Sequence, residues 1–430
     1  MAISGRFVLL SLLGLIPVAL LPGWGSATVV VLLLAAAALL DLGLAASLRQ
    51  VSVQRNDPGS VPLTGSAESV LTVSNAGRRA LRGLVRDAWQ PSAGAQDPSQ
   101  RVHVPAGERR RMTVTLRPTR RGILAAAHVT VRAFGPLGLS ARQRTLSCPG
   151  SLRVLPPFHA RRHLPSKLRQ LRELDGRAAV QIRGAGTEFD SLRDYVRGDD
   201  VRSIDWRATA RRSAVVVRTW RPERDRRVVI LLDTSRTAAA RIADEPRLDT
   251  GIEAALLLAV LAERGGDRVD FLAFDRRLRA RAGSAAKGKL LGQLVQAVVP
   301  LDAELIELDW SQLPAQIRSV SAHRSLVVLL TALDGGAPEE GLLPMAAQLA
   351  RQHVVVVASV RDPMLGEMQQ ERSSASGVFR AAAAERALLE REAVSAQLRQ
   401  AGVEVVDAEP QQLPPALADA YIRLKAAGRL

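Results

Sequence analysis

Three oxygen-bearing side chains stand at alternate positions directly after an apolar stretch of the chain. Asp233, Ser235 and Thr237 follow the run Val228-Val229-Ile230-Leu231-Leu232. An apolar run of this length is typical of a buried strand, so we expect the three side chains on the loop at its carboxyl end. Hard cations such as Mg²⁺ take oxygen ligands and keep some of their waters, so this loop could bind Mg²⁺. The alternative is a hydroxyl-rich loop that only caps the helix after it.

The Asp-x-Ser-x-Thr pattern resembles the metal-ion-dependent adhesion site of von Willebrand factor type A domains. That resemblance implies two further ligands, a threonine from a second loop and an aspartate after a later strand. Here the second-loop region, 280–287, offers Ser284 but no threonine, and Asp334 stands two positions beyond Ala332, where the aspartate would be expected. The resemblance therefore implies a partly degenerate Mg²⁺ site made by Asp233, Ser235, Thr237 and Asp334, with retention and loss of the metal both open.

A strand-end aspartate is also the nucleophile of haloacid-dehalogenase-like phosphatases, whose pattern is Asp-x-Asp-x-Thr. The second aspartate of that pattern acts as acid and base in covalent phosphoryl transfer. Ser235 holds its position here and cannot take that role at neutral pH. Because the chain also has no Walker-type loop, nucleophile elbow or Cys/His pairing, we expect no catalytic residue and no nucleotide. A phosphatase-like enzyme is the least favoured interpretation.

Alternating strands and helices must position the Asp233 loop. Apolar strand segments are expected at 228–232, 268–274, 325–330, 354–360 and 403–406, and helices at 248–264 and 379–400. This alternation predicts a parallel sheet covered on both faces, with ligands bound outside the carboxyl ends of its strands. Residues 227–430 are thus predicted to form a von Willebrand factor type A-like α/β domain.

Short alternating segments dominate the region before this domain. Residues 69–73, 111–116, 127–131 and 152–155 alternate in hydropathy and are separated by Gly, Pro and Asn, which predicts a small β-sandwich over 49–158. This region also carries arginines at 109, 110, 111, 117, 120 and 121. They could lie together against anionic lipid or simply form a solvated basic face.

Two apolar runs open the chain, at 7–21 and 27–47, with an uncharged turn between them. They predict a two-helix transmembrane hairpin within residues 1–48. Arg6, Arg49 and Arg55 flank the runs, so both ends and the body of the chain are expected in the cytoplasm. A signal peptide is the alternative for the first run. Asp41, within the second run, is expected to reach the membrane interface.

Composition narrows the class of protein. The chain has 430 residues, 47% hydrophobic content and one cysteine, which excludes a disordered chain and a disulfide scaffold. Its net charge of +17 arises wholly within residues 1–227. Only 3% of residues are aromatic. Because the nucleobases of a single strand bind by stacking on aromatic side chains, this low content argues against nucleic acid as a partner. Membrane lipid is the more favoured partner of a basic surface.

A polar, basic segment, 159–226, joins the two predicted domains and is identified as a signature of the bacterial domain-of-unknown-function fifty-eight family. The matching positions are Gly186, Thr187, Glu188, Asp194, Tyr195, Gly198, Asp199, Asp200, Asp205, Trp206 and Arg207. Their paired charges could form a structural clasp across the α/β domain or a partner surface.

Members of that family resemble type A domain proteins and are often encoded beside MoxR-type AAA+ ATPases. The resemblance implies a membrane-anchored, cytoplasm-facing interaction module that serves such an ATPase as adaptor or chaperone partner. The alternative is a basic membrane-surface protein that binds lipid or nucleic acid without a metal.

Overall fold

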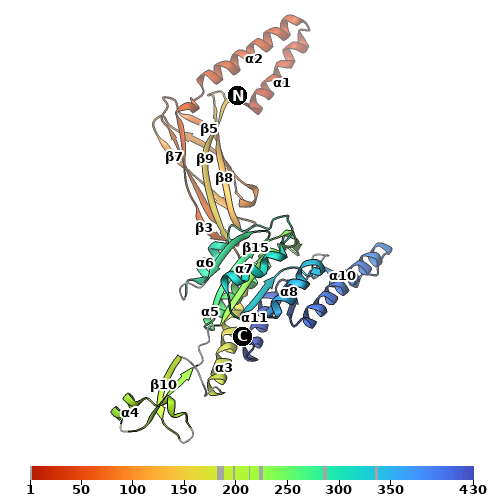
Figure 1. Ribbon diagram of the computed structural model, residues 1–430. Coiled ribbons are helices and arrows are strands. Elements are labelled where there is room, and N and C mark those ends of the chain that lie inside the picture. Colours follow the sequence, from red (N-terminus) through yellow and green to blue (C-terminus); the bar gives the residue numbers. More distant parts are fainter. Residues whose placement is uncertain are drawn as a thin grey trace. The chain divides into compact units, whose positions relative to one another are not determined.

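The computed structural model describes residues 2–181, 188–196, 199–212, 214–221, 226–283, 288–334 and 338–430. The chain divides into two compact units, Met1–Pro157 and Phe158–Leu430 (Figure 1). Each unit has its own hydrophobic core, and each is described separately below.

Two apolar helices open the first unit, α1 (Gly5–Leu20) and α2 (Trp24–Leu44). The 16 residues of α1 are somewhat fewer than the roughly 20 residues of a typical membrane span. The helical stretch Trp24–Gln50 is 27 residues long and strongly apolar. Within the described part of the chain it is the one helix long and apolar enough to cross a membrane, judged by length and composition.

Two β-sheets form the rest of the first unit. One sheet has the order β1-β9-β8-β5-β6 with β3 beside β9, and the other has the order β2-β4-β7. The strands are β1 (Ala2–Ile3), β2 (Val51–Asn56), β3 (Gly59–Pro62), β4 (Ala67–Asn75), β5 (Leu81–Trp89), β6 (Ser99–Val104), β7 (Arg109–Leu116), β8 (Gly122–Phe134) and β9 (Ser140–Leu155). Alternate apolar residues of both sheets, such as Leu71, Val114, Val85 and Val129, are wholly buried in one core.

A buried ion pair joins the two sheets. Arg55 of β2 donates two hydrogen bonds to Asp87 of β5, at 2.9 and 2.7 Å, and the two side chains are 2% and 0% exposed. The indole N–H of Trp89 donates to the same carboxylate at 2.9 Å. Asp87 therefore has several donors around it, as a buried carboxylate requires.

Asp41 of α2 is wholly buried against the rest of the first unit. Its carboxylate accepts backbone N–H bonds from Leu137 (2.8 Å), Leu139 (2.8 Å) and Ser140 (2.9 Å), in the turn between β8 and β9. Gly135 permits this close packing, since a Cβ there would lie 2.2 Å from the carbonyl oxygen of Asp41. Asp41 thus fastens α2 to the turn.

The arginines at the start of β7 and those that follow its end lie in two separate groups. Val51 pairs with Asn75, and Ser74 pairs with Arg109, so the start of β2, the β4–β5 turn and the start of β7 lie at one end of their sheet. Arg117 follows the opposite end of β7, roughly 24 Å away at the rise of an extended strand. The arginines named between 109 and 121 are thus divided between the two ends of β7.

The second unit begins with α3 (Leu164–Gln181) and a small hairpin. The hairpin pairs β10 (Glu188–Asp194) with β11 (Val216–Arg221) in antiparallel register, and α4 (Trp206–Arg212) lies between them in the chain. These two strands were not expected from the sequence.

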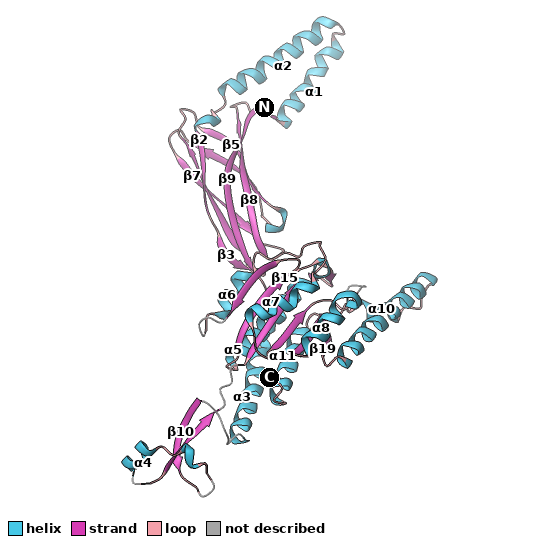
Figure 2. Cartoon of the chain, viewed as in Figure 1, coloured by secondary structure: helices cyan, strands magenta, loops and turns pink. Residues whose placement is uncertain are grey.

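A six-stranded sheet with the order β16-β15-β12-β17-β18-β19 is the centre of the second unit (Figure 2). Its strands are β12 (Arg227–Asp233), β15 (Arg268–Phe274), β16 (Leu278–Gly283), β17 (Leu326–Leu330), β18 (Val354–Val360) and β19 (Glu404–Ala408). Five strands run parallel and the edge strand β16 is antiparallel. A mixed α/β fold with a mainly parallel sheet is thereby confirmed.

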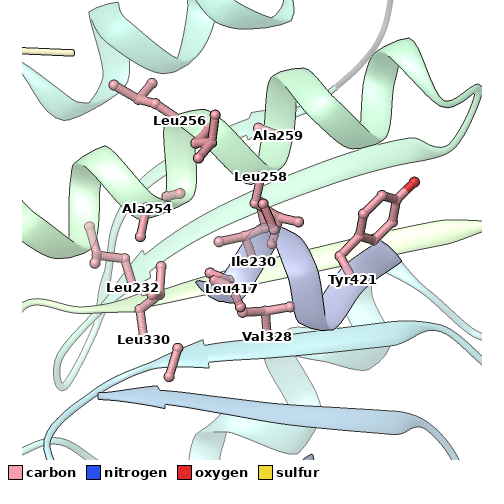
Figure 3. Close-up of a cluster of buried hydrophobic side chains, with 14 of the residues drawn as sticks. Ile230, Leu232, Ala254, Leu256, Leu258, Ala259, Val328, Leu330, Leu417 and Tyr421 are labelled. Carbon is pink, nitrogen blue, oxygen red and sulfur yellow. The ribbon is translucent and has the colours of Figure 1, made fainter. Parts of the chain in front are cut away.

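Helices cover both faces of this sheet. The helices are α5 (Arg247–Arg264), α6 (Leu290–Val298), α7 (Leu313–Val320), α8 (Leu343–Ala350), α9 (Met364–Gln369), α10 (Ala375–Gln400) and α11 (Leu413–Ala426); a two-residue pair, β13 (Arg241–Ile242) and β14 (Glu245–Pro246), precedes α5. Residues of α5, α6 and α11 share one core with Ile230 and Val328 of the sheet (Figure 3). Residues of α7, α8 and α10 share a second core with Val229 and Leu231. Successive residues of β12 therefore face opposite cores, which explains its continuous apolar run.

Candidate functional site

The Asp233 loop lies where the strand order of the sheet reverses. From β12 the chain passes through α5 to β15 on one side, and later returns to β17 on the other side of β12. Asp233 is the last residue of β12, and Thr331 comes directly after β17. Ligands of open α/β sheets bind in the crevice at such a reversal, outside the carboxyl ends of the strands.

Asp233 is the acceptor around which this loop is arranged. Its Oδ2 accepts hydrogen bonds from the hydroxyl groups of Thr331 (2.7 Å) and Thr237 (3.0 Å). Its Oδ1 accepts the backbone N–H of Ser235 at 2.7 Å, and the Ser235 and Thr237 hydroxyl oxygens lie 3.3 Å apart. The structure therefore brings together the three predicted residues Asp233, Ser235 and Thr237, and it adds Thr331.

A cavity of about 20 Å³ lies beside this cluster. Asp233, Thr237, Arg247 and Thr331 supply its polar lining, and the remaining lining residues are mostly apolar. A volume of this size holds a single water or an oxygen-sized group.

Asp334 does not join the Asp233 cluster. Its carboxylate forms ion pairs with Arg247, at the start of α5, and with Arg391 of α10. Arg391 also pairs with Asp407 of β19 at 2.5 Å. Asp334 therefore belongs to a neighbouring network of arginines and aspartates, and the four-residue metal set predicted from the sequence is not assembled in the structure. Ser284, the other ligand candidate, lies outside the described residues.

The donor types at Asp233 fit Mg²⁺, since carboxylate and hydroxyl oxygens are ligands that it accepts. The local charge does not fit. Asp233 is the one carboxylate of the cluster, and the guanidinium group of Arg247 touches the same loop, donating to the carbonyl oxygen of Thr237 at 3.0 Å. Within the described residues no group of three or more His, Cys, Asp or Glu is placed to hold a metal ion. With one carboxylate, the described residues of this loop do not complete the predicted Mg²⁺ site.

A second strand-end aspartate, Asp275, forms a hydrogen bond with the Asp233 loop. Asp275 follows β15, is wholly buried, and accepts the Thr234 hydroxyl at 3.1 Å together with the backbone N–H groups of Arg276 (2.6 Å) and Arg277 (3.1 Å). Asp275 was not among the site residues predicted from the sequence, although Asp275 stands directly after an apolar strand, as Asp233 stands at the end of one. The other residues missing from that prediction, Arg247 and Arg391, carry no local signal, because their partners are distant in the sequence.

The carboxylates of the signature segment stabilise the hairpin between β10 and β11. Asp199 pairs with Arg193 at 2.6 Å and accepts the N–H of Val196 at 2.9 Å. The Arg193 guanidinium, and next the Val196 N–H, hold the pKa of Asp199 below its usual value. In the part of the segment that the structure describes, these bonds stay within the hairpin.

Asp205 and Asp200 act in the same way. Asp205 accepts the N–H groups of Arg207 and Ala208, each at 3.0 Å, and pairs with Arg218 at 2.8 Å. The Ala208 N–H, followed by the Arg218 side chain, lowers the pKa of the Asp205 carboxyl. Asp200 accepts the N–H of Arg202 at 3.0 Å.

The other signature residues are less constrained in the structure. Glu188 and Asp194 are the end residues of β10, the Tyr195 N–H donates to the carbonyl of Val215, and Arg207 is exposed. Trp206 is 68% exposed, which leaves its indole free for a partner surface. Gly186, Thr187 and Gly198 lie outside the described residues.

Comparisons with known proteins find relatives whose function is unknown. An uncharacterized protein of Mycobacterium tuberculosis (strain H37Rv) and one of Mycobacterium bovis are each 28% identical over 186 residues, which cover 42% of this chain. The matched region spans 57% of the length of these relatives.

Two solved structures show distant likeness. The SpRpn10 VWA domain aligns with 46% of this chain and 93% of its own length, at 11% identity and a TM-score of 0.28. A PapD-like domain of human CEP192 aligns with 25% of this chain and 85% of its own length, at 13% identity and a TM-score of 0.19. Scores this low carry no argument about function. Residues 191–371, which hold most of the hairpin and the whole Asp233 cluster, match the family described as protein of unknown function DUF58.

Proposed function

We propose that this protein is a membrane-anchored, cytoplasm-facing interaction module, and that its type A-like α/β domain binds a MoxR-type AAA+ ATPase as adaptor or chaperone partner. The observation that carries the proposal is the convergence of Asp233, Ser235, Thr237 and Thr331 at the point where the strand order reverses. Buried polar groups at such an edge can orient a polar partner group. The partner contributes the rest of the contact, and no catalytic step is required of this chain.

The membrane part of the proposal rests on α2 and on the arginines near its end. Arg49, Arg78 and Arg109 are exposed near the start of β2, and Arg79 donates to the carbonyl oxygen of Gly43 in α2 at 2.6 Å. Basic residues next to a span favour the cytoplasmic side and anionic headgroups. We propose that α2 spans the membrane together with α1 in a hairpin, and that this basic end of the first unit contacts anionic lipid.

Direct binding tests the docking proposal. Full-length protein in nanodiscs is titrated with the purified MoxR-type ATPase of the same organism, and the Asp233→Ala variant is compared with Asp302→Ala. Asp302 is an exposed aspartate of the same unit and serves as the matched control. We expect Asp233→Ala to weaken binding by at least about tenfold, a loss of roughly 1.4 kcal/mol, while Asp302→Ala binds as the wild type does. Equal binding by both variants would contradict the proposal.

A further inference from the structure

Two buried arginines from opposite faces of the sheet hold one half-exposed aspartate at its carboxyl edge. Arg247 begins α5 and is 7% exposed, and Arg391 of α10 is 4% exposed. Both guanidinium groups pair with the carboxylate of Asp334, whose side chain is 43% exposed. The cationic side of the contact is thus built into packed helices, whereas the anionic side comes from Asp334, four residues after the end of β17.

The two arginines retain unused hydrogen-bonding capacity. Arg391 donates to Asp407 (2.5 Å) and to the hydroxyl of Ser359 (3.1 Å), and Arg247 donates to the Thr237 carbonyl (3.0 Å). The Nε atoms of both Arg247 and Arg391 are nevertheless buried without a hydrogen-bond partner in the structure. A buried charged group with an unmade hydrogen bond costs free energy, so the contact with Asp334 leaves this site incompletely satisfied.

We propose that Asp334 is an internal stand-in for a carboxylate of the docking partner, which displaces it from Arg247 and Arg391. The inference rests on the proposed function, because it names the chemical group that the docking edge recognises. Guanidinium forks match the two oxygens of a carboxylate. Exchange of one carboxylate for another leaves the charge of the site unchanged, and Asp334 is already close enough to water to be released at small cost.

The surroundings favour a carboxylate over a phosphate and over a metal-bridged contact. Asp407 already shares Arg391, and Asp233 lines the same cavity as Arg247, so a doubly charged anion would meet repulsion from both carboxylates. Arg247 itself supplies the positive charge that a metal ion would otherwise bring to this edge. The 20 Å³ cavity beside Arg247 has room for one oxygen atom of an incoming group.

Rescue by a small carboxylate tests this assignment without any partner. In full-length Asp334→Ala, kept in detergent, acetate should fill the vacated position between the two arginines. We expect about 100 mM sodium acetate to raise the unfolding temperature of this variant by about 2–4 °C relative to equal sodium chloride, and to leave the wild type unchanged. Equal effects of acetate and chloride on the variant would overturn the proposal, and so would a larger rise with phosphate than with acetate.

A matched variant controls for the general loss of an ion pair. Glu390 forms an exposed pair with Arg386 on the same helix as Arg391, with side chains 60% and 81% exposed. Glu390→Ala removes a carboxylate from an arginine that water already solvates. Its unfolding temperature should respond identically to acetate and chloride.

A labelled peptide of six glutamates provides the binding readout, with a six-glutamine peptide as the uncharged probe. Removal of the internal competitor should tighten hexaglutamate binding by roughly tenfold, the factor expected if Asp334 occupies the site in about nine of ten molecules. Adding Arg247→Lys to Asp334→Ala keeps the charge but removes the fork, and should cancel most of the gain. Unchanged hexaglutamate affinity in Asp334→Ala would refute the stand-in role.

The outcomes separate this inference from the proposed function. Acetate rescue without ATPase binding supports the carboxylate site and rejects the ATPase as its partner. ATPase binding that depends on Asp233, without acetate rescue of Asp334→Ala, keeps the docking edge and rejects the exchange at Arg247 and Arg391.

Discussion

At the residue scale, the Asp233 carboxylate organises the loop that follows β12. Three donors reach its two oxygens, and one of them, the Thr331 hydroxyl, comes from the neighbouring strand β17. Asp233 and Thr331 are 3% and 8% exposed, so their bond is shielded from competing water. This hydrogen bond continues the pairing of β12 and β17 beyond the ends of the two strands, beside the cavity.

We expect loss of the Thr331 hydroxyl to loosen this edge. Thr331→Val removes a hydrogen bond to a charged acceptor and should lower the free energy of unfolding by about 1.5–3 kcal/mol, measured by urea denaturation. Thr331→Ser keeps the donor and should recover most of the loss. If the valine and serine variants were equally stable, the bond to Asp233 would not contribute.

Removal of divalent cations should leave the protein unchanged. Three donors of the protein already bind the Asp233 carboxylate, so no dication is needed to hold the loop. We expect the unfolding temperature of the wild type in chelator to match that in millimolar Mg²⁺. A rise with Mg²⁺ that Asp233→Ala abolishes would restore the metal to this site.

Among the secondary-structure elements, the short β10–β11 hairpin has little hydrophobic core of its own and is stabilised by carboxylates bound to arginines and backbone N–H groups. The β10–β11 hairpin depends on Asp199 and Asp205, each bound to one arginine and to backbone N–H groups. The first unit instead joins its sheets through the buried pair Arg55–Asp87.

Acid should loosen the hairpin. The pKa values of Asp199 and Asp205 lie below the ordinary 3.8, so their contribution to stability is present above that value and is lost as the pH falls through the lower folded-state pKa. Hydrogen-exchange protection of the Val196 and Ala208 amides should be similar at neutral pH and at about pH 5, and should fall below about pH 3. Asp199→Asn should lose protection of Val196 already at neutral pH, whereas protection independent of pH would show that the carboxylates are dispensable.

Sequence patterns predicted the elements that a local period encodes and missed those set by distant contacts. The apolar run 228–232 became β12, and the run 354–360 became β18, because strands buried on both faces have no polar alternation. The convergence of Asp233, Ser235 and Thr237 followed from their place at a strand end. The capture of Asp334 by Arg247 and Arg391 could not be predicted, since it depends on how α5 and α10 pack on the sheet.

Across the whole molecule, the basic excess belongs to residues 1–227, which comprise the first unit and the beginning of the second. Within the first unit, the exposed arginines at 109–111 and at 117 and 120 lie at opposite ends of β7. The end that begins β2 follows directly on the apolar helix α2. If α2 spans the membrane as proposed, the arginines at this end are the ones expected to meet lipid headgroups.

Two double variants, each of which removes two positive charges, test whether the two groups of arginines differ in lipid binding. Arg78→Gln with Arg109→Gln should reduce the preference for phosphatidylserine over phosphatidylcholine by roughly 30-fold, at about 1 kcal/mol for each juxtamembrane base. Arg117→Gln with Arg120→Gln, at the other end of β7, should leave that preference unchanged. The readout is lipid retained by the full-length protein in native mass spectrometry, and an equal loss in both double variants would argue against a lipid-facing end.

The hydrogen bonds between Asp41 and the turn between β8 and β9 have a mechanical consequence. Three backbone N–H groups bind its carboxylate, and Gly135 leaves no room for a side chain between them and α2. A helix held in this way cannot swivel about its own axis without turning the sheets with it. If α2 spans a bilayer as proposed, force or tilt applied to this helix would pass as torque into β8 and β9, and the first unit would move with the helix as one body.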